Sequence, residues 1–129
     1  MAYQLSMLLV DDEVNVAHTL RMVFEDEGYF VTVAHSAAEA LAKLTVCQFQ
    51  VVITDLNLER ENVGLQVARA AKNLRPQPIV VICTGYADVA NLRAALDMKV
   101  DYVALKPVSL VELIGSLDRL LSMRRGTEK

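Results

Sequence analysis

With 129 residues, 53% of them hydrophobic, the chain fits one compact domain with a substantial core. Its apolar runs are far shorter than the ~18 residues of a membrane span, and its N-terminus lacks the pattern of a signal peptide. The net charge of −3 argues against a nucleic-acid surface, because such surfaces are basic. We therefore expect a cytoplasmic protein that binds neither membranes nor nucleic acid directly.

Strand-like and helix-like segments alternate five times along the chain. The strand-like segments are short and apolar, as buried parallel strands are, and in chain order they cover residues 5–10, 29–34, 49–54, 79–83 and 101–105. Each is followed by a helix-like segment, and these cover residues 13–27, 36–44, 64–74, 88–97 and 110–124. Capping boxes at Ser36 and Ser109 open two of the helices. The fourth helix is predicted from Val89, Leu92 and Leu96, which recur at helical spacing.

This alternation determines the fold class that we expect. Repeated strand–helix units give right-handed crossovers and a parallel sheet with helices on both faces. Five strands of this length favour an α/β, doubly wound, flavodoxin-like sheet with strand order 2-1-3-4-5. We expect one domain over residues 1–124, with residues 125–129 as a C-terminal tail or the start of a linker.

Polar residues stand at the ends of four of the predicted strands. Asp11 and Asp12 follow the first strand, Asp55 the third, Thr84 the fourth and Lys106 the fifth. Open α/β sheets bind ligands outside the carboxyl ends of their strands. Because strands 1 and 3 are neighbours in the predicted order, the three aspartates should converge, with Thr84 and Lys106 on the other side of Asp55.

The residue types of this predicted site point to phosphoryl chemistry. Clustered carboxylates stay ionised together around a cation, and a hard ion with oxygen ligands, Mg²⁺ or Mn²⁺, suits them. Asp55, the lone carboxylate of the middle strand, is expected to attack phosphorus and form an acyl phosphate. The metal and Lys106 would offset the phosphoryl charge, and Thr84 would donate a hydrogen bond to it. Taken singly, each acid is explained by a helix cap or a loop; their joint order is what indicates a site.

The four segments that carry these residues resemble the receiver domain of bacterial response regulators. The likeness runs from about residue 6 to residue 123. It implies that Asp55 is the phosphoacceptor and that Asp12 binds the metal directly. It further implies that Asp11 binds the metal through water or assists, and that the backbone carbonyl of Asn57 is another metal ligand.

The resemblance also implies a signalling function. A histidine kinase or histidine phosphotransfer protein would phosphorylate Asp55, and Thr84, as a switch hydroxyl, and Lys106, which pairs with the phosphoryl group, would then alter a partner-binding face. Other expected partners are an output domain or downstream protein, and a second copy bound through the fourth helix, fifth strand and fifth helix. Apart from self-phosphorylation and slow autodephosphorylation, the protein would not be an enzyme. The bond between Lys106 and Pro107 is expected to be cis.

The loop after Asp55 departs from the family pattern. Leu58 and Glu59 stand where the family commonly has a Met-Pro pair, and Gly64 follows Asp55 by nine positions instead of the usual eight. This spacing predicts a one-residue insertion in the loop.

The position of the switch aromatic also departs from the pattern. Val103 stands three residues before Lys106, where the family often has Tyr or Phe, while Tyr102 comes one step earlier and should face the opposite side of the sheet. We hypothesise that switching proceeds without a rotating aromatic ring. We also hypothesise that Tyr86, together with Asn57, shields the acyl phosphate from water.

Two alternative functions stay open at this point. The atypical loop and Val103 keep open a receiver-like interaction module that works without phosphorylation, although the full set of acids, Thr84 and Lys106 argues against it. A Mg²⁺-dependent phosphatase or phosphotransferase would also use Asp55, but it would usually need a second acid where Asn57 stands, and 129 residues leave no room for a cap.

The remaining cysteine and histidine residues carry weaker expectations. Cys47 and Cys83 are predicted to be buried apolar residues of a reduced protein. His18 is predicted to lie on the surface. His35 precedes a helix and is interpreted as a loop residue, with a place at the rim of the site as the alternative.

Overall fold

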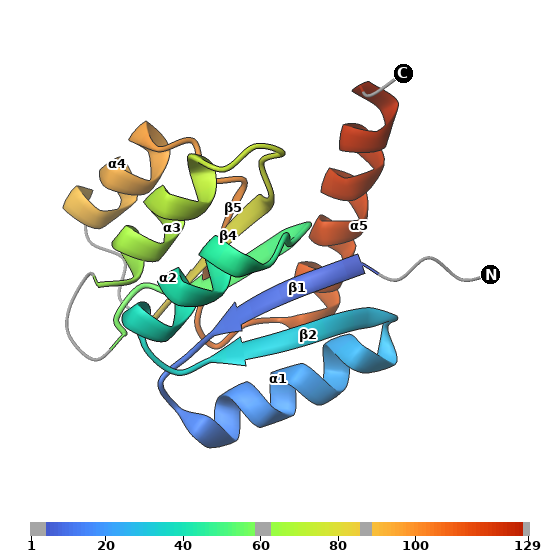
Figure 1. The fold of residues 1–129 in the computed structure, drawn as a ribbon, viewed down its shortest axis with the longest axis horizontal. Coiled ribbons are helices and arrows are strands. Elements are labelled where there is room, and N and C mark those ends of the chain that lie inside the picture. The colour runs from blue at the N-terminus through green and yellow to red at the C-terminus, as the bar shows by residue number, and fades with distance from the viewer. Residues whose placement is uncertain (1–4, 59–62, 86–88, 128–129) are drawn as a thin grey trace.

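The computed structural model describes residues 5–58, 63–85 and 89–127 (Figure 1). Within these residues it confirms the predicted alternation of strands and helices. The strands are β1 (Leu5–Val10), β2 (Tyr29–Ala34), β3 (Val51–Asp55), β4 (Ile79–Thr84) and β5 (Tyr102–Leu105). The helices are α1 (Val14–Asp26), α2 (Ala37–Val46), α3 (Gly64–Lys72), α4 (Val89–Asp97) and α5 (Leu110–Thr127).

The five strands form one parallel sheet in the order β2-β1-β3-β4-β5, which confirms the predicted flavodoxin-like topology. The pairing register aligns the carboxyl ends of the strands. Val10 pairs with Ala34 on one side and Thr54 on the other, and Asp55 pairs with Cys83. The residues that follow β1 and β3 therefore meet at one edge of the sheet.

Both faces of the sheet are buried, each by its own group of helices. Alternate strand residues such as Leu8 and Val52 pack with α2, α3 and Ala95 of α4. Their neighbours, such as Leu9 and Ile53, pack with α1 and α5 (Figure 1). A sheet with two covered faces is apolar along its whole length and leaves its edges for polar chemistry.

The structure differs from the predicted element boundaries by one or two residues at several element ends, and by three at the end of α5. β3 begins at Val51 rather than at residue 49, because Gln50 pairs with Ser6 partly through its side chain. The Ser6 N–H donates to Gln50 Oε1 at 2.7 Å, while the Gln50 N–H donates to the Ser6 carbonyl at 2.9 Å. α5 continues to Thr127, beyond the predicted end at Arg124, since backbone hydrogen bonds extend a helix without further core residues. The proposed domain boundary at residue 124 stays a prediction.

The apolar residues that predicted α4 do not face the core. Val89 and Leu96 are 79% and 74% exposed and Leu92 is exposed too, whereas Asn91 and Ala95 are buried. Apolar spacing identifies one face of a helix but not which way that face points. The exposed face of α4 is therefore a surface that the core does not use.

Within the described residues, no helix is long and apolar enough to cross a membrane.

Tyr29 links the edge strand β2 to α1 on the α1–α5 side of the sheet. Its ring is buried and meets Phe24 edge-on, with ring centroids 5.7 Å apart. Burial raises the pKa of Tyr29 to about 12, and the nearby charges of Asp118 and Glu27 add to the rise. The neutral phenol is therefore the form that the fold favours.

We predict that Tyr29 makes the protein less stable in alkali. Because its folded pKa of about 12 exceeds the ordinary value of 10, the unfolded chain loses this proton first as the pH rises. The contribution of neutral Tyr29 is fully present below pH 10 and is lost by pH 12, and it amounts to about 2–3 kcal/mol. Urea denaturation of wild type and Tyr29→Phe across this range measures it. Equal alkaline losses in the two proteins would contradict the prediction.

Candidate functional site

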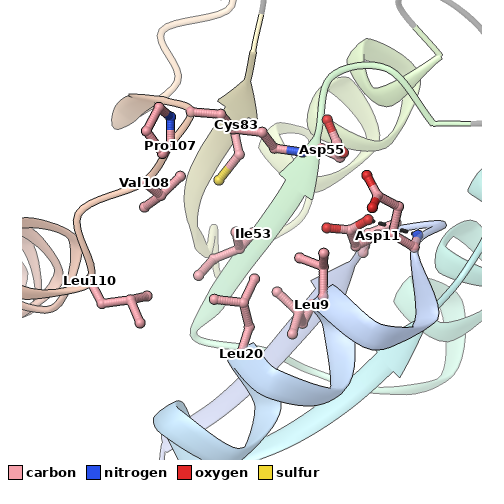
Figure 2. Close-up of a pocket in the computed structure, with 13 residues that line it drawn as sticks. Leu9, Asp11, Leu20, Ile53, Asp55, Cys83, Pro107, Val108 and Leu110 are labelled. Carbon is pink, nitrogen blue, oxygen red and sulfur yellow. Dashed lines mark hydrogen bonds and ion pairs between the residues drawn. The ribbon is translucent and has the colours of Figure 1, made fainter.

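Three carboxylates converge at the carboxyl edge of the sheet, as the sequence predicted. Asp11 and Asp12 follow β1, and Asp55 is the last residue of the neighbouring β3. One oxygen from each lies within 4.8 Å of the others. Asp11 and Asp55, both labelled in Figure 2, are buried, while Asp12 is exposed, so the cluster opens to solvent on one side.

Lys106 brings a positive charge to this cluster from the end of β5. Its Nζ lies 2.8 Å from Asp55 Oδ2, and its backbone N–H donates to the Thr84 carbonyl at 2.8 Å. Burial lowers the pKa of Lys106, but the hydrogen bond and charge of Asp55 raise it by more, and Asp11 adds to the rise. The lysine is therefore held in its charged form. The Lys106–Pro107 peptide bond is cis, as the family resemblance implied.

The surroundings of Asp11 disfavour its ionised form. Burial raises its pKa, the Glu13 N–H lowers it by donating to Asp11 Oδ1 at 2.9 Å, and the charge of Asp55 raises it again, to a net increase. A cation near the three acids would relieve this cost. The donor set consists of hard carboxylate oxygens only, which fits Mg²⁺ or Mn²⁺.

Asn57 and Thr84 also lie where the sequence placed them. The backbone N–H of Asn57 donates to Asp55 Oδ1 at 3.3 Å. Thr84 is buried at the end of β4, in register with Leu105. The Asp55 carboxylate is thus oriented from two sides, by Asn57 and by Lys106. The roles predicted for the Asn57 carbonyl and the Thr84 hydroxyl stay predictions.

Gly64 begins α3 in contact with the backbone of Asp55. Its N–H donates to the Leu56 carbonyl at 2.8 Å, and a Cβ on Gly64 would lie 1.9 Å from the Asp55 carbonyl oxygen. A side chain at this position would therefore collide with the strand that carries Asp55. Leu58 and Val63, on either side of the loop tip, are buried. Residues 59–62, on which the predicted insertion falls, lie outside the described residues, and so does Tyr86.

Tyr102 and Val103 face opposite sides of the sheet, as predicted. Tyr102 packs with the α1–α5 core, and Val103 packs with the core on the other face. Val103 therefore occupies the position of the family's switch aromatic, and Tyr102 does not replace it.

A mostly apolar cavity of about 300 Å³ opens beside the carboxylates, between α1 and the start of α5 (Figure 2). Asp11, Asp55 and Lys106 line it together with aliphatic side chains. The aliphatic lining includes Leu9, Val16, Leu20, Ile53, Val108 and Leu110. Sequence reasoning missed this cavity, because its walls come from segments that are far apart in the chain.

Sequence reasoning also left the place of His35 open. The structure places its Nδ1 3.1 Å from the backbone carbonyl of Asp11, so the ring lies at the rim of the site. Nothing in the spacing of the sequence signals this contact beyond the position of His35 directly after β2.

The fold and the site together define a class. A doubly wound parallel sheet carries three converging aspartates, one of them paired with a lysine, at its carboxyl edge. The sequence model of the response regulator receiver domain matches residues 7–118, and the chain belongs to that family.

Relatives and solved structures agree with this assignment. The chain is 29% identical over 123 residues to the response regulator ArlR of Staphylococcus saprophyticus and 30% identical to ArlR of Staphylococcus aureus. In both cases the match covers 95% of this chain and 54% of the relative, so the chain spans about half the length of these relatives.

Two solved structures are similar along nearly the whole chain. A CheY-like receiver domain protein from Methanospirillum hungatei has a TM-score of 0.90 and 28% identity, over 97% of this chain and 99% of that one. A response regulator from Burkholderia pseudomallei, solved with a phosphorylated aspartic acid, a calcium ion and citrate, has a TM-score of 0.80 and 28% identity. That match covers 95% of this chain and 72% of the other.

The two cysteines differ in exposure, which corrects one prediction. Cys83 is buried, as expected, but Cys47 is exposed, because it follows the last turn of α2 and lies beyond the packed face of that helix. Burial raises the pKa of the Cys83 thiol to about 12; the charge of Asp55 adds to the rise and Lys106 opposes it. The thiolate is the reactive form, so Cys83 should be inert.

We predict that a thiol reagent near neutral pH modifies one cysteine of the folded protein. Cys47 should react readily and Cys83 should not, because Cys83 is both buried and protonated. Mass spectrometry after alkylation measures this, with Cys47→Ser expected to abolish labelling and Cys83→Ala expected to leave it unchanged. Rapid labelling of Cys47→Ser without denaturant would show that Cys83 is accessible.

We further predict that Gly64→Ala destabilises the protein by about 2–3 kcal/mol, since the new Cβ overlaps the Asp55 backbone. The matched control is Gly115→Ala in α5, where a Cβ meets nothing closer than Arg119 Nη1 at 3.6 Å. That change should be neutral or stabilising, because alanine favours a helix. Urea denaturation compares the two variants, and equal effects would count against the close contact at Gly64.

Proposed function

We propose that Asp55 accepts a phosphoryl group from a histidine kinase or histidine phosphotransfer protein. The observation that carries this proposal is the Asp55–Lys106 ion pair, 2.8 Å long, inside a cluster of carboxylates at the carboxyl edge of the sheet. Clustered carboxylates repel one another, so ligand chemistry explains their convergence better than stability does. Family membership and the phosphorylated aspartic acid of the Burkholderia relative support the proposal.

In the proposed transfer, an oxygen of Asp55 attacks the phosphorus of a phosphohistidine. The bond from phosphorus to the donor imidazole breaks, the electron pair returns to that nitrogen, and an acyl phosphate forms on Asp55. Lys106, already charged and within reach, neutralises part of the phosphoryl charge. Thr84 donates a hydrogen bond to a phosphoryl oxygen.

Asp11, Asp12 and Asp55 would hold Mg²⁺ or Mn²⁺, with the Asn57 carbonyl as a further ligand. When bound, the ion would offset the negative charge of the acids and of the incoming phosphoryl oxygens. The three converging carboxylates and the raised pKa of Asp11 support this assignment.

The output of the phosphorylated state is proposed to lie on α4, β5 and α5. These elements carry exposed apolar side chains, namely Val89, Leu92 and Leu96 on α4 and Leu105 on β5, which is 58% exposed. An output domain, a downstream protein or a second copy of the chain would bind there. Phosphorylation would shift the population of two states of this face.

The wider biological setting follows from the same proposal. A protein that receives phosphoryl groups from histidine kinases works in the cytoplasm and needs no contact with nucleic acid or membrane of its own. Its chemistry is limited to phosphorylation from donors and slow autodephosphorylation, so it is not an enzyme in the usual sense.

The first experiment is incubation with Mg²⁺ and acetyl phosphate, followed by intact-mass spectrometry. We expect a mass increase of one phosphoryl group that requires Mg²⁺ and is lost in Asp55→Asn, because the acyl phosphate forms on that carboxylate. Asp118→Asn, which changes an exposed aspartate of α5, is the matched control and should still be phosphorylated. If wild type shows neither an adduct nor a response to beryllofluoride, the chain acts by binding alone.

A further inference from the structure

Both backbone polar groups of Asp11 contact residues at the end of β2 or directly after it. The Asp11 N–H donates to the Ala34 carbonyl at 3.0 Å, and the Asp11 carbonyl lies 3.1 Å from Nδ1 of His35. A carbonyl oxygen only accepts hydrogen bonds, so Nδ1 must carry the proton and donate it. Asp11 is therefore fixed from β2 as well as by its own strand.

We propose that His35 is a positioning residue for the cation site, because its Nδ1–H fixes the peptide group between Asp11 and Asp12. This peptide is planar, so the direction of the Asp11 carbonyl sets the direction in which Asp12 leaves the turn. Asp12 is the exposed member of the cluster and is the one least held by packing. The inference rests on the proposed function, since it concerns the same cation.

His35 is itself held in place by the start of α2. Its backbone N–H donates to Glu39 Oε1 at 2.7 Å, and the Glu39 N–H donates to Ser36 Oγ at 3.1 Å. In the usual capping box the glutamate returns to the N–H of the capping serine. Here it reaches the residue before the serine, and the box therefore anchors the residue whose ring touches Asp11.

These contacts connect the cap of α2 to the metal ligands through a chain of hydrogen bonds. Groups that orient metal ligands from outside the coordination shell commonly change metal affinity when they are removed. The hydrogen bond from His35 is partly exposed to solvent, so its loss should have a moderate effect. The predicted effect is weaker cation binding with an intact fold.

The experiment measures the affinity for Mn²⁺ from the electron paramagnetic resonance signal of the free ion. His35→Phe keeps a ring but removes the donor, and we expect it to weaken Mn²⁺ binding about 3- to 10-fold. His35→Asn restores a donor near the position of Nδ1, and we expect an affinity within about twofold of wild type. His18→Phe, the same change at the exposed histidine of α1, is the matched control and should bind as wild type does.

A second measurement tests the contact without any substitution. Long-range ¹H–¹⁵N NMR of the wild type, with the ring neutral, should show the proton of His35 on Nδ1. A proton on Nε2 would overturn the inference, because the Asp11 carbonyl would then lack its donor.

The outcomes separate this inference from the proposed function. If wild type binds Mn²⁺ and His35→Phe binds it equally well, His35 does not position the site, although the proposed function stands. If His35→Asn is as weak as His35→Phe, restoring the donor does not restore Mn²⁺ binding, and the inference is wrong. If wild type does not bind Mn²⁺, the proposed cation site fails, and the inference fails with it.

Discussion

The candidate site depends on the convergence of three carboxylates at one edge of a parallel sheet. Because β1 and β3 are neighbours, Asp11, Asp12 and Asp55 converge whether or not their charges are balanced. Lys106 neutralises one of these charges, while burial and, to a smaller extent, the charge of Asp55 raise the pKa of Asp11. The close approach of Gly64, the turn at Asn57 and the ring of His35 all hold backbone next to this cluster. Together these contacts fix the backbone around the carboxylates.

At the opposite edge of the sheet, by contrast, charged side chains have a structural role. There Asp101 Oδ2 accepts the Val80 N–H at 2.7 Å and lies 3.6 Å from Lys72 Nζ. Asp101 thus pairs with one base, Lys72, and also accepts a hydrogen bond from a backbone N–H near the start of β4. At the carboxyl edge, three acids meet Lys106, so negative charge is in excess there, although Asp11 and Asp55 also accept hydrogen bonds from backbone N–H groups. This difference is the physical reason for assigning ligand chemistry to the carboxyl edge and stability to the amino edge.

The sequence was sufficient to predict the topology and the convergence of the aspartates, because both follow from the order of short apolar strands and the residue after each. It could not predict features that depend on contacts between distant segments. The spacing of Val89 and Leu96 identified a helix face but not its direction. Cys47 was predicted to be buried because its type usually is, whereas its place after the end of α2 exposes it. The hydrogen bond from His35 to the Asp11 carbonyl joins two loops that are distant in the sequence, so no local sequence pattern predicts it.

The same contacts suggest how the site communicates with the surface. Since Tyr102 and Val103 lie on opposite faces of β5, the position of the usual switch aromatic holds a residue too small to swing between two sites. A direct backbone route exists instead. The Lys106 N–H is bonded to the Thr84 carbonyl, and Thr84 pairs with Leu105, whose side chain is exposed. A movement of Thr84 and Lys106 toward a phosphoryl group would therefore shift the end of β5 itself. We therefore propose that the strand, rather than a rotating ring, connects Asp55 to the proposed partner surface.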